Sequence, residues 1–265
     1  MIEKQLHWLA NRSLLEVAGN DAFRFLQNLV TNDLNGSQPN LVYSALLTPQ
    51  GKYLFDFFVI KKSNFQFFID ISSQTKDEFL TRLMLYKLRS DVSIEEVNGW
   101  VGVGFFDRPS GALNDPRCEK LGWRKYFFEN LPYQTNMPTL NKEIYDSVRV
   151  DYCIPETGVE LIKDQTFILE AGLDRLAGVS FTKGCFIGQE VTARMRHKTQ
   201  LQKGLARVRI LGKIGGSAND ILFNDKVVGT LFTRSDDYAI AYLKFKYRDS
   251  FLTVGNAQVI LVERY

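Results

Sequence analysis

Hydrophobic and polar positions follow a strand-like pattern in three successive segments of the first third of the chain. Residues 42–48 (VYSALLT), 53–60 (YLFDFFVI) and 65–71 (FQFFIDI) are rich in β-branched and aromatic residues. Residues 49–52 (PQGK) provide a turn between the first two. The pattern therefore predicts a three-stranded meander.

Other periodic segments predict a mixture of strands and helices up to about residue 200. The predicted strands are 13–18, 92–97, 100–106 and 123–128, and the predicted helices are 20–30, 72–89 and 167–176. Residues 144–151 should also be regular, whereas proline, asparagine and glycine make 108–142 a long irregular connection.

Short alternating strands separated by turn residues dominate the C-terminal part. They are predicted at 205–211, 226–233, 238–243 and 257–262. This pattern is typical of a small all-β sandwich or barrel. We therefore divide the chain into an α+β region, residues 1–200, and a β domain, residues 201–265.

Composition changes this picture little. Apolar residues make up 45% of the 265 residues, and the net charge is only +3. These values are ordinary for a globular protein and do not favour nucleic-acid binding. The N-terminus lacks the apolar run of a signal peptide, and no segment has the ~20 consecutive apolar residues of a membrane helix. Three widely spaced cysteines do not form a disulfide framework, which favours a reduced, cytoplasmic protein.

Two features carry candidate chemistry. Asp56 lies within the most apolar predicted strand. Its carboxylate must be paired, face a cavity or change its protonation, unless that side of the strand faces solvent.

The stretch 181–199 (FTKGCFIGQEVTARMRHKT) places Cys185 close to Lys183, Gln189 and Glu190, just before a basic run. A thiol reacts or binds metal as the thiolate, a form that neighbouring cations favour.

The chain resembles the YgfZ/GcvT-like folate-binding family, which assists iron–sulfur cluster assembly. The specific match is KGCFIGQE at 183–190, against the family signature K-G-C-[FY]-x-G-Q-E. The supporting matches, in the family's order, are FLQNLVTNDL (25–34), LLTPQGKYLFDF (46–57), YKLRSDV (86–92), IPETGVE (154–160) and LEAGLDRLAGVSFTKGC (169–185). The resemblance implies a fold like the glycine-cleavage T-protein, with an α+β body around a central channel and a small C-terminal β-barrel.

The resemblance also implies a ligand, tetrahydrofolate or a one-carbon derivative. A pterin presents a fork of two N–H donors, which a carboxylate can accept as it accepts a guanidinium. Glu170, in LEAG, is the candidate pterin anchor, and Asn32, Asp33 and Asp56 would line the same channel. The remaining candidate folate-binding residues are Lys183, Gln189, Glu190 and Arg194. Cations from Lys183 to Arg209 would suit a polyglutamate tail, with a solvated face or a nucleic-acid surface as alternatives.

Cys185 is the candidate functional thiol, and its chemistry stays open at this point. It could be a nucleophile, although only His7 and His197 could act as its base. It could instead give one thiolate to a cluster shared with a partner, act as a redox-sensitive thiol, or be a small buried apolar residue. No metal site within the chain is predicted.

The expected function is that of a folate-binding accessory protein for iron–sulfur assembly or repair, including support of tRNA modification through client enzymes. The alternative is a folate-dependent aminomethyltransferase like the T-protein. That family carries two adjacent aspartates where this chain has Phe55 and Asp56, and it lacks the KGC thiol, so the accessory role is favoured over an enzyme. The expected partners are folate and iron–sulfur client or assembly proteins, without membrane or direct nucleic-acid binding. The expected form is a monomer in a bacterial cytoplasm.

Overall fold

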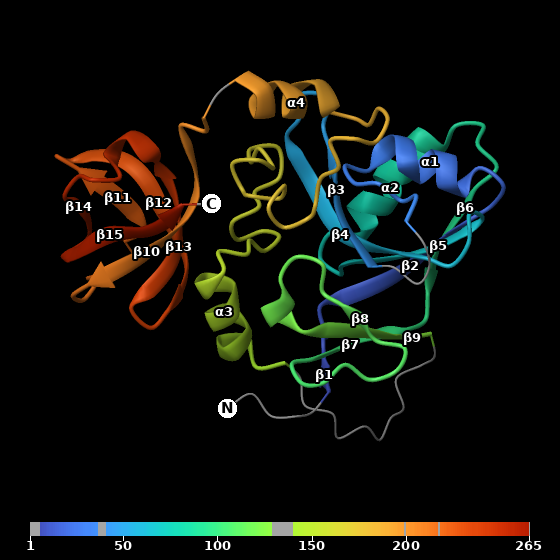
Figure 1. Ribbon diagram of the computed structural model, residues 1–265, viewed down its shortest axis with the longest axis horizontal. Helices are drawn as coiled ribbons and strands as arrows, with labels where there is room; N and C mark the ends of the chain where they lie inside the picture. The colour runs from blue at the N-terminus through green and yellow to red at the C-terminus, as the bar shows by residue number, and fades with distance from the viewer. Residues whose placement is uncertain (1–5, 37–40, 129–139, 199, 217, 265) are drawn as a thin grey trace.

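The computed structural model describes residues 6–36, 41–128, 140–198, 200–216 and 218–264. Within these residues the chain forms an α+β body and a closed β-barrel, joined by the connection after helix α4 (Figure 1). The body contains one five-stranded and one four-stranded sheet. The predicted α+β body with a small C-terminal barrel is therefore confirmed.

A five-stranded antiparallel sheet forms the centre of the body. Its order is β3 (Leu41–Leu47), β4 (Tyr53–Lys61), β5 (Gln66–Ser72), β2 (Arg12–Ala18) and β6 (Ser93–Val97). The predicted meander is confirmed as β3–β4–β5, with β2 and β6 added beyond β5.

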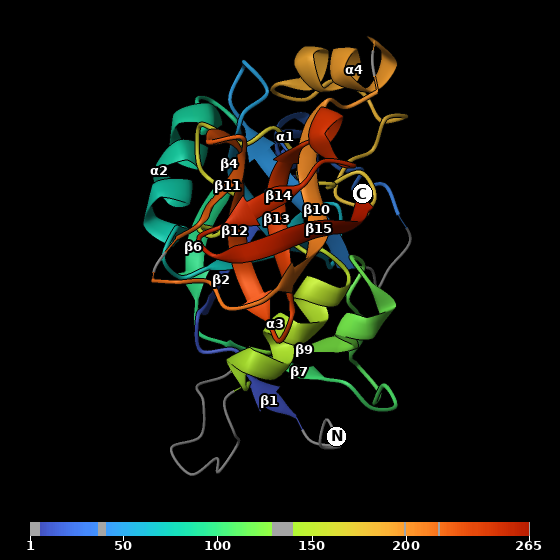
Figure 2. The same cartoon turned by 90° about the vertical axis from the view of Figure 1, so that its left-hand side faces the viewer.

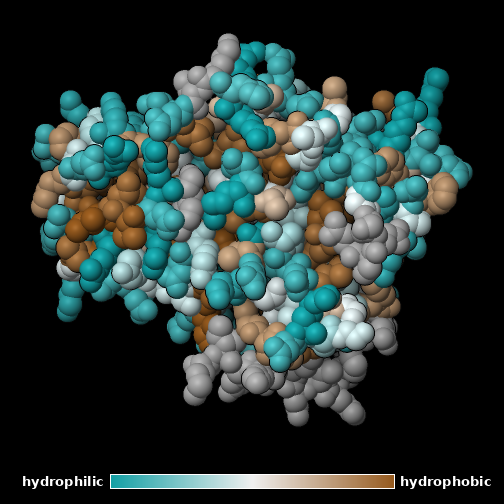
Figure 3. All heavy atoms as spheres, viewed as in Figure 1, coloured by the Kyte–Doolittle hydropathy of each residue, from teal (hydrophilic) through white to brown (hydrophobic). Residues whose placement is uncertain are grey.

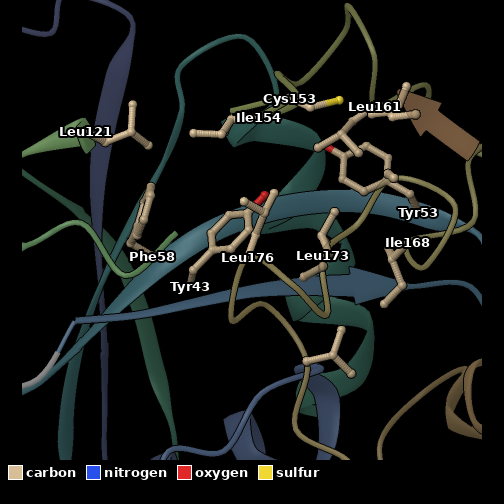
Figure 4. Packing of buried hydrophobic residues seen from close by; sticks show 14 of the residues in the cluster. Tyr43, Tyr53, Phe58, Leu121, Cys153, Ile154, Leu161, Ile168, Leu173 and Leu176 are labelled. Carbon is tan, nitrogen blue, oxygen red and sulfur yellow. The ribbon is translucent and has the colours of Figure 1, made fainter. Parts of the chain in front are cut away.

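Both faces of the sheet are buried at β4, which explains why this strand is apolar nearly throughout. On one face Phe55, Phe57 and Val59 pack in the same hydrophobic cluster as helices α1 (Ala22–Leu29) and α2 (Lys76–Lys87). On the other face Phe58 and Ile60 join the loop segment 153–179 (Figure 4). Because side chains alternate along a strand, Asp56 belongs to this second face.

A smaller antiparallel sheet lies at the lower end of the body in Figure 1. Its order is β1 (His7–Trp8), β7 (Trp100–Gly104), β9 (Trp123–Phe127) and β8 (Leu113–Asn114). The strands predicted at 100–106 and 123–128 are thereby confirmed, the second of them inside the connection 108–142 that we otherwise expected to be irregular. Part of that connection, 129–139, lies outside the described residues.

The barrel closes in the order β10, β13, β12, β11, β14, β15. The strands are β10 (Lys203–Leu211), β11 (Asp220–Phe223), β12 (Lys226–Ser235), β13 (Tyr238–Lys244), β14 (Leu252–Val254) and β15 (Ala257–Arg264). Figure 2 views the molecule from the barrel side, with α3 (Lys142–Asp151) below the barrel strands and α4 (Gln189–Lys198) above them. Strands β11 and β14 were not predicted, because only three or four residues carry each pattern.

The helix predicted at 167–176 is wrong. The segment folds as consecutive turns, in which the Ala171 amide donates to Phe167 and the Leu173 amide to Ile168. Gly172 interrupts the segment with φ of +74°, a left-handed conformation that an α-helix cannot contain. Its apolar side chains still pack inward, so helical spacing predicted their burial but not the backbone.

Candidate functional site

A cavity of about 420 Å³ lies where the two sheets meet helix α3 and the segment 155–159. Its size falls within the range of small-molecule sites in proteins. The wall residues that matter most below are Arg12, Asp56, Phe58, Arg117, Arg124 and Thr157. The space-filling view in Figure 3 shows hydrophilic and hydrophobic side chains intermixed over the body on the face seen there.

Asp56 contributes a buried carboxylate to this cavity. Its exposed fraction is 6%, so the alternative that it faces solvent is excluded. Oδ2 accepts a hydrogen bond from the Tyr43 hydroxyl at 3.1 Å, and Oδ1 accepts from the Tyr53 hydroxyl at 2.7 Å and from Thr157 Oγ1. All three donors are neutral, so hydrogen bonding rather than an ion pair holds this carboxylate.

The two tyrosines are fixed in their donating form. Burial, followed by the charge of Asp56, raises the pKa of Tyr43 and of Tyr53 well above its ordinary value. Tyr43 lies on β3 and Tyr53 on the neighbouring strand β4. Figure 4 shows their rings in the same cluster as Leu173, Leu176 and Ile168. The two tyrosine hydroxyl groups therefore stay protonated and donate to Asp56.

A second set of ionisable groups lies on the α3 side of the cavity. Arg149, 1% exposed, is within 3.1 Å of Glu160 and of Asp146 and within 3.0 Å of Glu156. Its Nη2 also donates to Thr233 Oγ1 of the barrel at 2.9 Å. This cluster fixes the barrel against α3, and its cation is fully matched by carboxylates.

The stretch that carries Cys185 is held by Lys183. The Lys183 ammonium donates to the carbonyl oxygens of Gln27 (2.7 Å), Asn32 (3.0 Å) and Val30, where helix α1 ends. Burial lowers the pKa of Lys183 to about 8, although Asp33 opposes the shift. Lys183 thus binds the C-terminal end of α1, where a cation is favoured by the helix dipole.

Cys185 itself is exposed, between two buried residues. Lys183 and Phe186 are each 7% exposed, whereas Gly184 and Cys185 are open to solvent. A Cβ on Gly184 would meet nothing within 4 Å. The chain therefore presents the thiol on a short projection that is anchored on both sides, and the alternative of a buried apolar cysteine is excluded.

Asn32 and Asp33 make hydrogen bonds within the body. Asn32 Nδ2 donates to the carbonyl oxygens of Tyr43 (2.8 Å) and Ala177 (2.6 Å). Asp33 Oδ1 accepts from Gln27 Nε2 at 2.8 Å and from the backbone amide of Asn35. Burial raises the pKa of Asp33, but these hydrogen bonds outweigh burial and lower it overall.

Glu170 lies where the body meets the barrel. It is 7% exposed and accepts a hydrogen bond from the Tyr242 hydroxyl, and its Oε1 is 3.8 Å from Lys203 Nζ. Its backbone oxygen accepts from the Leu205 amide of β10 at 2.7 Å. Burial and the bond to Glu170 raise the pKa of Tyr242, which therefore donates to this carboxylate.

The remaining candidates lie on helix α4. Gln189 begins the helix, and Glu190 pairs with Arg194 at 2.6 Å along its exposed face. Arg207 and Arg209 belong instead to β10, and Arg207 pairs with Asp151. The cations that are consecutive in sequence are thus divided between α4 and the barrel.

Of the nine candidate residues, all of them in the described part of the chain, Asp56 is the one that lines the cavity. The structure brings Asn32, Asp33 and Lys183 together at the end of α1, and it leaves Glu170 and the α4 residues elsewhere. Sequence reasoning missed three cavity arginines, Arg12, Arg117 and Arg124, because they come from separate segments without a shared motif. In the described residues no group of three or more His, Cys, Asp or Glu is placed to hold a metal ion.

Residues 10–104 match the GCVT N-terminal domain, and residues 202–263 match the CAF17 C-terminal beta-barrel domain. The chain thus joins a segment that matches the GCVT N-terminal domain to one that matches the CAF17 C-terminal beta-barrel domain. The resemblance derived from the sequence is thereby confirmed.

Several relatives that the chain resembles in sequence are named iron–sulfur cluster assembly factors. The chain is 30% identical over 234 residues to the mitochondrial factor IBA57 of Homo sapiens, covering 77% of this chain and 65% of the relative. It is 30% identical over 225 residues to the homologue of Mycosarcoma maydis, covering 76% and 55% respectively. The chain thus spans between about half and two thirds of these relatives.

Both relatives are named as mitochondrial proteins, so the expectation of a bacterial cytoplasmic protein is wrong. Among solved structures, the aminomethyltransferase T of the glycine cleavage system from Bartonella henselae matches with a TM-score of 0.76. That match covers 98% of this chain and 84% of the other at 11% identity, and it establishes the shared fold alone. None of the helices described is long and apolar enough to span a membrane.

Proposed function

We propose that this protein is an accessory factor in the assembly or repair of iron–sulfur clusters in client enzymes, and that it binds tetrahydrofolate or a one-carbon derivative. The observation that carries the accessory role is the exposed Cys185 thiol, anchored by Lys183 and Phe186. The names of the relatives support the same role. In this proposal the iron–sulfur cluster, or its precursor, is a substrate that a partner protein brings to this chain, and not a resident cofactor.

The cavity fits tetrahydrofolate by its chemistry. Asp56 Oδ2 accepts from Tyr43 alone among the described residues, so an acceptor position remains for an N–H group of a pterin. Phe58 lies on the same face of β4 and belongs to the cavity wall, where its side chain is 1% exposed. When bound, tetrahydrofolate would supply a carrier for one-carbon units, and Asp56 would hold its pterin edge.

Glu170 is the second candidate for the pterin, as its match to LEAG implied. Tyr242 already occupies one of its oxygens at the barrel, whereas Asp56 faces the cavity directly. The two assignments differ in a measurable way. By titration calorimetry with tetrahydrofolate, we expect Asp56→Asn to weaken binding at least tenfold and Glu170→Gln to weaken it less. The reverse order would assign the pterin to Glu170, and unchanged affinity in both would remove tetrahydrofolate from this cavity.

The thiol role is tested in cells that lack a related factor. The full chain is expected to restore the activity of an iron–sulfur enzyme, and the Cys185→Ser variant should not. Cys118→Ser is the matched control, because Cys118 is only partly exposed and packs against the hydrophobic cluster of the body. Full rescue by Cys185→Ser would eliminate the thiol from the function.

The alternative function is that of an aminomethyltransferase, a class that includes a protein of the same fold. It predicts a different result in a turnover assay. An enzyme of that class would release ammonia and methylene-tetrahydrofolate from an aminomethyl-loaded carrier protein. We expect no such turnover, and sustained turnover would replace the accessory role by catalysis.

A further inference from the structure

One end of the barrel gathers lysine side chains from several strands. The pairing of β10 with β13 places Lys203 directly opposite Lys244, and the pairing of β12 with β13 brings the start of β12, with Lys226, to the same end. The short 3-10 helix η2 (Phe245–Tyr247) follows β13 there and adds Lys246. In Figure 1 this is the upper end of the barrel, where the connection from α4 enters β10. We call it the basic end, and it is defined by Lys203, Lys226, Lys244, Lys246, Tyr247 and Phe251.

The charges in the two loops of the basic end do not balance. These loops, residues 224–226 and 244–251, contain four cations and two carboxylates. One cation and one carboxylate, Arg248 and Asp249, pair with each other at 3.1 Å. The other carboxylate, Asp225, is left with three lysines, all of them exposed and none in an ion pair with a described residue. The two loops therefore carry an excess of two positive charges.

The neighbouring strands do not remove this excess. Lys203 and Lys244 face each other on adjacent strands, and like charges in that position destabilise a sheet. Lys203 has a carboxylate, that of Glu170, at 3.8 Å. The end of β15 adds one charge of each sign, Glu263 and Arg264. The basic end therefore has a positive potential that attracts anions.

Aromatic rings lie among these cations. Phe251 directly precedes β14, whose pairing with β11 places it beside the turn 224–226, and it is 66% exposed. Tyr247 is half-buried against Phe223, with 5.1 Å between the ring centres, and Lys246 Nζ lies 4.8 Å from the centre of the Tyr247 ring. A single exposed ring is common on protein surfaces, but rings interleaved with unpaired cations are typical of sites for single-stranded nucleic acid.

The exposed ring distinguishes between the polyanions that this charge would attract. An acidic polypeptide would meet the lysines but offers no flat ring to Phe251, and a membrane surface requires a wider apolar face than one ring. The bases of a single strand can stack on Phe251, whereas those of a duplex are already stacked inside it. The expectation of no direct nucleic-acid binding rested on the net charge of the whole chain, +3, which does not report this local excess.

We propose that the basic end of the barrel binds single-stranded nucleic acid, with phosphates at Lys226, Lys244 and Lys246 and one base stacked on Phe251. None of these residues lines the cavity, and none belongs to the segment that carries Cys185. The site therefore depends neither on folate binding nor on the thiol. RNA and single-stranded DNA share the chemistry that these residues recognise, so both are used in the test.

Fluorescence anisotropy measures binding of the full chain to fluorescein-labelled oligouridylate and oligothymidylate, each about 20 nucleotides long and so longer than the site of one small barrel. Titrations between about 50 and 200 mM KCl give the slope of the logarithm of the affinity against the logarithm of the salt concentration. The variants are Lys244→Gln/Lys246→Gln and Phe251→Ala. Their matched controls are Lys213→Gln, exposed beyond the other end of β10, and Phe65→Ala, 59% exposed on the body.

We expect the wild type to bind both oligonucleotides, with a salt slope that the double lysine variant reduces by about 1.4, roughly 0.7 for each lost phosphate contact. Phe251→Ala should weaken binding about fivefold or more and leave the slope unchanged, because it removes stacking and no charge. The two controls should change neither quantity. Tighter binding of one oligonucleotide upholds the proposal and identifies the sugar that the site prefers.

Four results would overturn the proposal. They are no binding at about 50 mM KCl, a wild-type slope in the double lysine variant, wild-type affinity in Phe251→Ala, and tighter binding of another polyanion than of the single strands. The other polyanions tested are a duplex of the same length, polyglutamate and phosphatidylglycerol vesicles. Circular dichroism of each variant establishes that it is folded.

Discussion

Replacing Lys183 by methionine should destabilise the protein and release the segment that carries Cys185. The substitution removes three hydrogen bonds from an ammonium to the carbonyl oxygens of Gln27, Val30 and Asn32. Hydrogen bonds from a charged donor contribute roughly 1.5–3 kcal/mol each. Burial of the ammonium offsets part of this, since a pKa lowered from 10.5 to about 8 corresponds to a cost of about 3 kcal/mol. We therefore expect Lys183→Met to lower the free energy of unfolding by about 2–5 kcal/mol.

The pH dependence of this effect has a defined sign. The pKa of Lys183 is lower in the folded protein than in the unfolded chain, so between pH 8 and pH 10.5 the unfolded chain binds more protons. The contribution of Lys183 to stability therefore rises with pH across this window. The difference in unfolding free energy between the wild type and Lys183→Met should widen by about 2 kcal/mol from pH 7 to pH 9.5.

Urea denaturation at pH 7 and pH 9.5 measures both quantities, with Lys226→Met as the control because Lys226 is exposed at the start of β12. A thiol reagent should also modify Cys185 faster in Lys183→Met than in the wild type. Equal stability of Lys183→Met and wild type would refute the anchoring role. A stability difference that does not change with pH would show that the carbonyl oxygens and the end of α1 keep the ammonium charged, contrary to the lowered pKa.

Three further predictions concern other parts of the body. Burial raises the pKa of Cys153 to about 12, so at pH 8 a thiol reagent should modify Cys185 and leave Cys153 intact, as peptide mass spectrometry would detect; rapid native labelling of Cys153 contradicts its burial. Gly172→Ala should cost about 1–2 kcal/mol in urea denaturation, because φ of +74° is strained for alanine, and an unchanged midpoint would argue against that conformation. Arg149→Met should lower the unfolding free energy by roughly 3–5 kcal/mol, since Glu160 is left buried without its cation, whereas a loss below about 1 kcal/mol would show that hydrogen bonds alone hold Glu160.

The central sheet could be predicted from the sequence because its signals are local. The segments 42–48, 53–60 and 65–71 alternate and are separated by turn residues, and they form β3, β4 and β5 in that order. Helix α2 could be predicted for the same reason, since its apolar spacing is local and Phe79 and Leu83 are buried on its inner side. The placement of β2 beside β5, and of β6 beside β2, depends on pairing between distant residues and was not predicted.

Two segments show where local patterns mislead. Residues 167–176 have helical spacing, yet Gly172 takes a left-handed conformation and the segment folds as turns around the shared core. Residues 189–198 were interpreted for their motif and their charge and no helix was predicted there, although they form helix α4 with a Glu190–Arg194 pair one turn apart. Spacing alone reports which side chains are buried, while the backbone follows from glycine conformations and capping contacts.

The polar groups of the body show why a site is harder to predict than a fold. Asp56 stood out because a carboxylate within an apolar strand needs a partner or a cavity, and the structure provides neutral donors and a cavity. Lys183 stood out for its place beside a thiol, but its ammonium is committed to the end of α1. The three cavity arginines, Arg12, Arg117 and Arg124, had no signal in the sequence, because they come from separate segments. They meet Asp70 and Asp115 only in the folded chain. A residue's type and neighbours in sequence therefore indicate that a polar group must be satisfied, whereas the tertiary pairing decides whether any of its hydrogen-bonding capacity is left for a ligand.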